Sequence, residues 1–103
     1  MCTYQTETLE VIGSAKGPER WFRVSEAVVY LDHPQHALAE HTLNVDFRNP
    51  ALGPATRSAV ELDPAAALRL ARAIVDALRA APPGLLPGVD PDELARLGVA
   101  VSA

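Results

Sequence analysis

The chain has 103 residues, a net charge of −4 and 49% hydrophobic residues, as expected for one small globular domain. No run of Lys or Arg forms a stripe that would neutralise phosphates, which argues against a nucleic-acid partner. No stretch approaches the roughly 20 apolar residues that span a bilayer, and the first residues lack the features of a signal peptide. A single cysteine forms no internal disulfide. We therefore expect a cytoplasmic protein without a membrane partner.

Four β-strands are predicted in the first part of the chain. In residues 3–12, β-forming side chains partly alternate with polar ones, and the glycines of 13–18 favour a loop. Aromatic and β-branched residues are concentrated in 21–31, which predicts the second strand. Strict alternation in 41–47 predicts a third strand with one apolar and one polar face. The same reasoning places the fourth strand at 56–62.

A helix is predicted over residues 64–80. Asp63 is a suitable N-cap, and Pro64 suits the first helical position, where a missing amide proton costs nothing. The charged residues that follow lie on one side of the expected helix. The opposite side is apolar, so we expect it to lie on the sheet. Its residues are Leu68, Ala71, Ile74, Val75 and Leu78.

The C-terminal segment is predicted to be an appendage. Four prolines and two glycines in residues 81–91 break regular structure, so we expect a compact domain at 1–81 and a Pro/Gly-rich linker with a short helical tail at 82–103. Asp90 is the expected N-cap of the tail helix, and Gly98 its expected end.

The expected fold is α+β. Connections too short for crossover helices favour a four-stranded antiparallel sheet in the order β-β-β-β-α, with the amphipathic helix packed on one face. The other face stays exposed unless a second copy covers it, which favours a homodimer.

All three histidines fall within nine residues, at His33, His36 and His41. The proline after His33 suits a turn that closes at His36, and His41 opens the third strand and returns to the same neighbourhood. Three imidazoles suit one transition-metal ion, which would be Zn, Fe, Cu or Ni. Glu40 and Asp46 are candidate catalytic carboxylates that would move a proton at such a site. One alternative is a site that uses the three histidines without metal, as acid-base or ligand-binding groups. The other is a polar connection that contains histidines without a function.

Cys2 is the second candidate. Removal of Met1 would leave an N-terminal cysteine whose amine and thiol chelate a metal, and an activated thiolate is also a nucleophile. If the first two strands form an antiparallel hairpin, the start of the chain lies beside the end of the second strand, close to His33. The alternative is a small residue at a frayed terminus.

Three segments carry a resemblance: the start MCTY, the segment GSAKGPERWF, and above all YLDHPQHALAEHTLNVDFRNP followed by GPATRSAVELD. On these residues the chain resembles a family of small uncharacterised actinobacterial proteins, with a DHPxHAxxEHTLNxDFxNP segment, over roughly residues 1–80. The resemblance implies that Cys2, His33, His36 and His41 belong to the family pattern. It implies no activity.

The interpretation favoured by the sequence is a small metal-binding protein, expected to be a metalloenzyme that acts on a small molecule. His33, His36 and His41 would bind the metal, with Cys2 or a nearby carboxylate completing the shell. As an enzyme it would be a hydrolase, a lyase or an oxidoreductase. One alternative is a metal-independent enzyme with Cys2 as nucleophile and a histidine as base. The other is a non-catalytic module that binds a metal or ligand.

Overall fold

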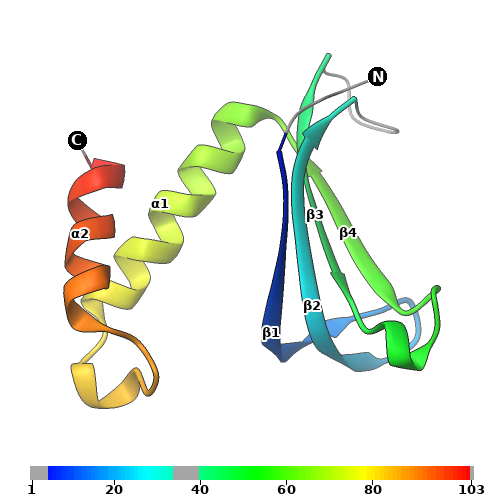
Figure 1. Cartoon of the computed structure of the whole chain (residues 1–103), viewed down its shortest axis with the longest axis horizontal. Helices are drawn as coiled ribbons and strands as arrows, with labels where there is room; N and C mark the ends of the chain where they lie inside the picture. Colours follow the sequence, from blue (N-terminus) through cyan, green and yellow to red (C-terminus); the bar gives the residue numbers. More distant parts are fainter. Residues whose placement is uncertain (1–4, 34–39, 103) are drawn as a thin grey trace. The chain divides into compact units, whose positions relative to one another are not determined.

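The structure, a computed structural model, describes residues 5–33 and 40–102. It divides into two compact units, Met1–Pro64 with the strands and Ala65–Ala103 with the helices, and each is described by itself. Four antiparallel strands followed by a long and a short helix confirm the α+β class (Figure 1). The boundary after residue 81, the packing of the long helix on a sheet face and the homodimer stay predictions.

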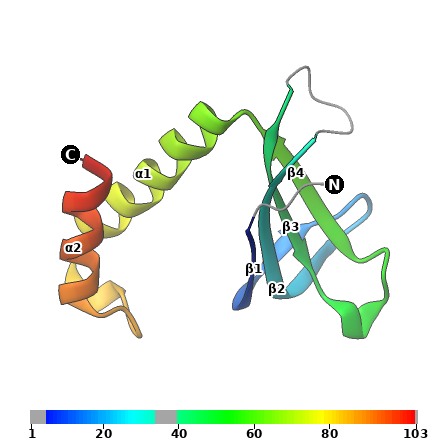
Figure 2. The same cartoon turned by 45° about the horizontal axis from the view of Figure 1, so that its top comes forward.

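One antiparallel sheet contains four strands, in the order β1 (Thr6–Lys16), β2 (Trp21–Asp32), β3 (Thr42–Arg48) and β4 (Arg57–Leu62). Strands that follow one another in the chain are neighbours in the sheet, as Figures 1 and 2 show, because their connections are too short for crossovers. β2, β3 and β4 begin and end within one residue of the predicted bounds. Alternation and β-propensity therefore located these three strands.

The end of β1 differs from the prediction. The register between β1 and β2 shifts between Glu10 and Gly13, but pairing then continues as far as Lys16, opposite Trp21. The predicted loop at 13–18 was therefore wrong for residues 13–16. Pairing with a segment rich in aromatic and β-branched residues outweighs the weak strand propensity of glycine and serine, and a bulge absorbs the irregularity.

The actual turn between β1 and β2 is short. The backbone N–H of Gly17 donates to the carbonyl of Arg20 at 2.9 Å. A Cβ added at Gly17 would lie 3.1 Å from that same oxygen, so the turn favours a residue without a side chain.

The register gives the sheet two chemically different faces. The apolar face carries Leu9, Ala27, Val29, Leu31, Leu43, Val45, Phe47, Val60 and Leu62. The polar face carries Glu26, Tyr30, Asp32, Thr42, Asn44, Asp46, Arg48, Arg57 and Glu61, with Val24 and Val28 among them. The predicted separation of polar and apolar side chains along β3 is therefore confirmed.

Burial does not follow this polarity. Thr42 on the polar face is fully buried and Asn44 is 6% exposed, whereas Phe47 on the apolar face is 37% exposed. The valines of the polar face, Val24 and Val28, are also buried. Most of the core of the strand unit thus lies on the polar face, along β2 and at the beginning of β3.

In the helical unit, α1 spans Pro64–Ala80, as predicted. A short 3₁₀ turn, η2 (Pro83–Leu85), follows within the predicted linker. The second helix, α2, spans Pro91–Ser102. The Asp90 carboxylate accepts the backbone N–H of Asp92 at 2.9 Å, which confirms the predicted cap.

The prediction that Gly98 ends this helix was wrong, since α2 continues to Ser102. A Cβ at Gly98 would lie 2.5 Å from Nε of Arg79 on α1. This glycine therefore leaves room for a side chain of the neighbouring helix and does not terminate its own. Among the residues described, no helix has the length and apolar character needed to cross a membrane.

Candidate functional site: a histidine pair beyond the β2–β3 ladder

His33 and His41 lie opposite each other just beyond the end of the β2–β3 ladder. The last ladder pair joins Asp32 to Thr42, so the same register continued by one residue joins the two histidines. Their ring centroids are 4.5 Å apart, with 34° between the ring planes. Because directly opposed residues of antiparallel strands have Cβ atoms about 5 Å apart, the ring contact follows from the register. The structure thus brings together two of the three histidines that the sequence indicated.

The backbone orients the ring of His33. Its Nδ1 lies 3.2 Å from the carbonyl oxygen of Glu40. Since a carbonyl oxygen only accepts a hydrogen bond, Nδ1 carries the proton in this contact, and the neutral ring then has its lone pair on Nε2. The Asp32 carboxylate accepts the backbone N–H of His33 at 2.7 Å. An imidazole held by a backbone carbonyl with its other nitrogen available is the usual state of a metal-binding histidine.

His36 and Cys2, the other two predicted ligands, lie outside the described residues. Within residues 5–33 and 40–102, no group of three His, Cys, Asp or Glu side chains is arranged to hold a metal ion. A complete site at the histidine pair would therefore need at least one ligand from the rest of the chain.

The hairpin predicted to carry the start of the chain towards His33 is present. β1 begins at Thr6, which pairs with Tyr30 two residues before the end of β2. The N-terminal end of β1 and the histidine pair are therefore at the same end of the sheet. Cys2 precedes Thr6 by four residues, a span of at most about 14 Å for extended chain.

The two candidate catalytic carboxylates differ in position. Glu40 is next to His41 in the chain, and its backbone carbonyl contacts His33. Asp46 is five residues farther along β3, roughly 15 Å in an extended strand. Its Oδ1 accepts a hydrogen bond from the guanidinium of Arg57 at 2.9 Å. The structure therefore does not bring Asp46 to the histidines.

A family model described as a family of unknown function, DUF6295, matches residues 1–87. The chain belongs to this family. The match includes the whole sheet, the histidine pair and α1. Neither the search of curated proteins nor the search of solved structures found a match. Membership gives the chain a family without a reaction, so the chemistry must be argued from its residues.

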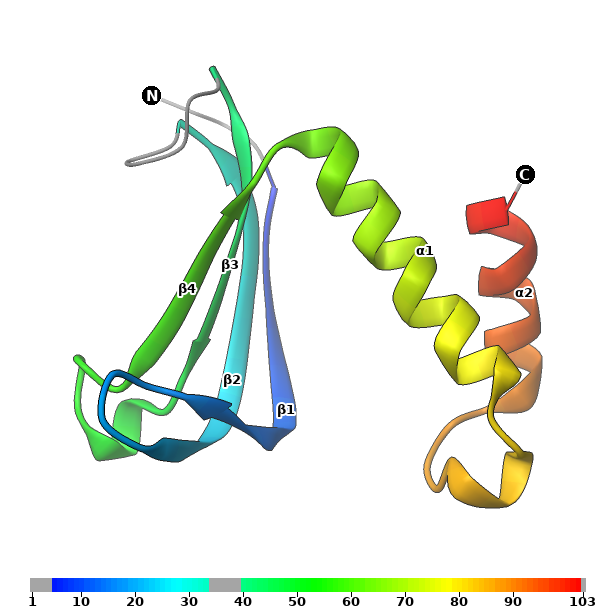
Figure 3. The same cartoon turned by 180° about the vertical axis from the view of Figure 1, so that it is seen from behind.

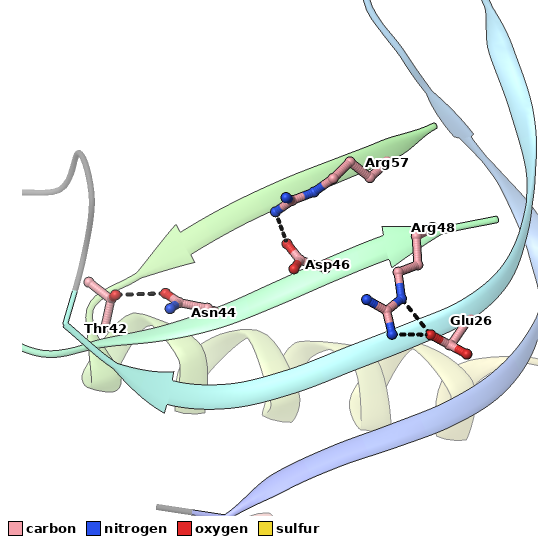
Figure 4. Close-up of polar contacts among 6 residues, drawn as sticks. All are labelled: Glu26, Thr42, Asn44, Asp46, Arg48 and Arg57. Atoms are coloured by element: carbon pink, nitrogen blue, oxygen red, sulfur yellow. Dashed lines mark hydrogen bonds and ion pairs between the residues drawn. The ribbon is translucent and has the colours of Figure 1, made fainter. Parts of the chain in front are cut away.

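In this member of the family, the polar face holds a row of bonded side chains that the sequence did not reveal (Figure 4). Thr42 donates its hydroxyl to Oδ1 of Asn44 at 2.7 Å, and both side chains are buried. Farther along the face, Asp46 pairs with Arg57 from β4. The guanidinium of Arg48 contacts the carboxylate of Glu26 on β2. Three separate bonded pairs thus follow one another along β3, from the histidine end of the sheet towards the opposite end.

Asn49, directly after β3, holds the next connection through two hydrogen bonds. It is 8% exposed, and its Nδ2 donates to the carbonyl of Arg23 on β2 at 2.9 Å. Its backbone N–H also donates to the carbonyl of Thr56 at 3.2 Å. Asn49 therefore attaches the connection between β3 and β4 to the body of the sheet. The alternation of β3 ends before this residue, so no sequence signal indicated its role.

Proposed function

We propose that this protein binds one transition-metal ion at the histidine end of its sheet. His33 and His41 supply two imidazole nitrogens, and the observation that carries the proposal is their ring contact at 4.5 Å. The hydrogen bond from Nδ1 of His33 to the Glu40 carbonyl supports it, because it leaves Nε2 as the ligand atom. Zn, Fe, Cu and Ni all accept imidazole ligands.

His36 is the proposed third ligand and Cys2 the fourth. His36 lies in the chain between His33 and Glu40, and these two residues are in contact with each other. Cys2 is close enough along the chain to reach the same end of the sheet from Thr6. In this proposal the four residues are the reason for the DHPxHAxxEHTLNxDFxNP pattern and for the N-terminal Met-Cys-Thr of actinobacterial family members.

With three histidines as ligands, one coordination position is open to water or to a small substrate when Cys2 is not bound. On this basis we propose a metalloenzyme that acts on a small molecule. We further propose that it is cytoplasmic. Glu40 would exchange a proton with the substrate, because it is the carboxylate next to His41 in the chain. Asp46 is left out of the proposed catalytic group because of its distance along β3 and its pairing with Arg57.

The direct test is elemental analysis of full-length protein purified without a histidine tag. We expect about one Zn, Fe, Cu or Ni per chain. His33→Asn and His41→Asn should each reduce the metal content to a small fraction, because each removes an imidazole ligand. Asparagine is close to histidine in size, so the packing changes little. Glu7→Gln is a suitable control, since Glu7 is an exposed residue of β1 near the same end of the sheet, opposite Val29.

Replacing the metal with cobalt shows by absorption which of the proposed residues are ligands. A thiolate ligand gives an intense charge-transfer absorption that imidazole ligands do not give, so its loss in Cys2→Ser would assign the cysteine. Loss of tetrahedral cobalt absorption in His36→Asn would assign the third histidine. Tag-free protein that folds, contains no metal and binds none of the four added ions would refute the proposal.

A further inference from the structure

A cavity of about 490 Å³ lies at the end of the sheet opposite the histidine pair. Two connections that are far apart in the sequence border it, the turn between β1 and β2 and the segment between β3 and β4. Figures 1 and 3 show these connections side by side. The volume is within the range of small-molecule sites, which is about 300–1,000 Å³.

The cavity is lined by apolar residues and by two arginines. Phe22, Leu52 and Ala55 line the apolar part, while Arg20 and Arg57 line the charged part. Leu52 is 60% exposed, so a large aliphatic side chain faces solvent at the border of the cavity. Leaving apolar surface in water is unfavourable, and a ligand that covers Leu52 would remove that cost.

The apolar wall is attached to the sheet. Leu52 belongs to the 3₁₀ turn η1 (Pro50–Leu52), and Asn49, which precedes this turn, is bonded to the carbonyl of Arg23 on β2. The hydroxyl of Thr56 donates to the carbonyl of Leu52 at 3.1 Å and closes the far side of the same segment. A cavity whose walls are held by hydrogen bonds loses little entropy when a ligand enters.

The charged part has unused donor capacity. Arg57 binds Asp46 through one terminal nitrogen, and its side chain is 50% exposed. A guanidinium has five N–H donors, so a second acceptor can bind without displacing Asp46. Glu19 is the only acidic side chain among the described residues that line the cavity, against two arginines.

We infer that this cavity binds a small organic anion, a carboxylate attached to a compact apolar body. The carboxylate would contact Arg20 and Arg57, and the apolar body would lie against Phe22 and Leu52. The length of β2 between Trp21 and Asp32 is about 35 Å for an extended strand, so this site is separate from the proposed metal site. It is a binding site and not part of the metal chemistry.

The experiment titrates phenylacetate into ¹⁵N-labelled full-length protein and follows the amide signals by NMR. We expect saturable shifts confined to residues 17–22 and 52–57, with a dissociation constant on the order of 1 mM for a ligand of this size. Phenylacetamide has the same shape without the charge, and it should bind about tenfold more weakly because the charge-assisted hydrogen bonds are lost.

Variants assign the binding to the two walls. Arg20→Gln should weaken phenylacetate binding about tenfold, and Leu52→Asn should weaken both ligands. Arg69→Gln, on α1, is the matched control and should leave the titration unchanged. The inference is overturned by an absence of saturable shifts in folded protein, by equal binding of acid and amide, or by shifts centred elsewhere in the chain.

Discussion

The two ends of the sheet use different means to bring distant residues together. At the histidine end, the register of β2 and β3 alone places His33 opposite His41. At the other end, the walls of the cavity belong to irregular connections, and a buried side chain, Asn49, holds one of them in position. The histidine contact therefore depends on strand pairing, whereas the cavity depends on the residue that attaches its connection.

The largest expected effect is that of metal on stability. At about 100 times its dissociation constant, a bound ion should raise the free energy of unfolding by about 2.7 kcal/mol, because it binds only the folded chain. Urea denaturation with and without Zn measures this increment, and hydrogen exchange should show added protection at the histidine end. In His33→Asn the increment should vanish. Equal protection at both ends would argue against a site confined to the histidines.

The next effect concerns the buried pair of Thr42 and Asn44, on the polar face near the histidine end. Asn44→Ala should lower the free energy of unfolding by about 2 kcal/mol, because it removes the acceptor of the fully buried Thr42 hydroxyl. Thr42→Val together with Asn44→Ala should cost less than the sum of the single changes. Thr8→Ala, on the exposed strand β1, is the control. Additive costs in urea denaturation would show that the hydrogen bond contributes little.

A smaller cost is expected at the loop end. Asn49→Ala should lower the free energy of unfolding by about 1.5 kcal/mol through loss of the bond to the Arg23 carbonyl. Hydrogen exchange should become faster in residues 50–56, and any phenylacetate binding should weaken with it. Metal binding at the other end should not change. Equally faster hydrogen exchange at both ends of the sheet would mean that Asn49 supports the whole sheet.

The smallest effects separate the two ion pairs of the polar face. The Asp46 side chain is 13% exposed and that of Glu26 is 27% exposed, so Asp46 with Arg57 should have the larger coupling energy. Double-mutant cycles with glutamine and asparagine replacements should give about 1 kcal/mol for this pair and about 0.5 kcal/mol for Glu26 with Arg48. Added salt should reduce the second coupling more than the first. The reverse order would show that the burial of Asp46 does not strengthen its pairing with Arg57.

The sequence predicted the strands better than it predicted the residues between them. Alternation located β3 and β4, and an aspartate before a proline located the start of α1. The bulge of β1 was missed because Gly13 and Ser14 signal a loop when they are considered without their partner strand. Gly98 was misread for a similar reason, since its role lies in the space that it leaves for Arg79.

The candidate site was predicted in part. The proline-led connection and the return into β3 indicated that the histidines converge, and His33 and His41 do contact each other. Asp46 was included because it is close in sequence to His41. An extended strand, however, separates residues by about 3.3 Å per position, and the alternation places Asp46 on the polar face with Asn44.

By itself, the order of residues determined the four strands, their antiparallel pairing and the two helices, because periodicity, caps and short connections act locally along the chain. Only the tertiary structure decided which face of the sheet is buried and what Asn49 contacts. Alternation separates polar from apolar side chains, but burial depends on what packs against each face of the sheet. For that reason Thr42 and Asn44 are buried, whereas Phe47 remains partly exposed.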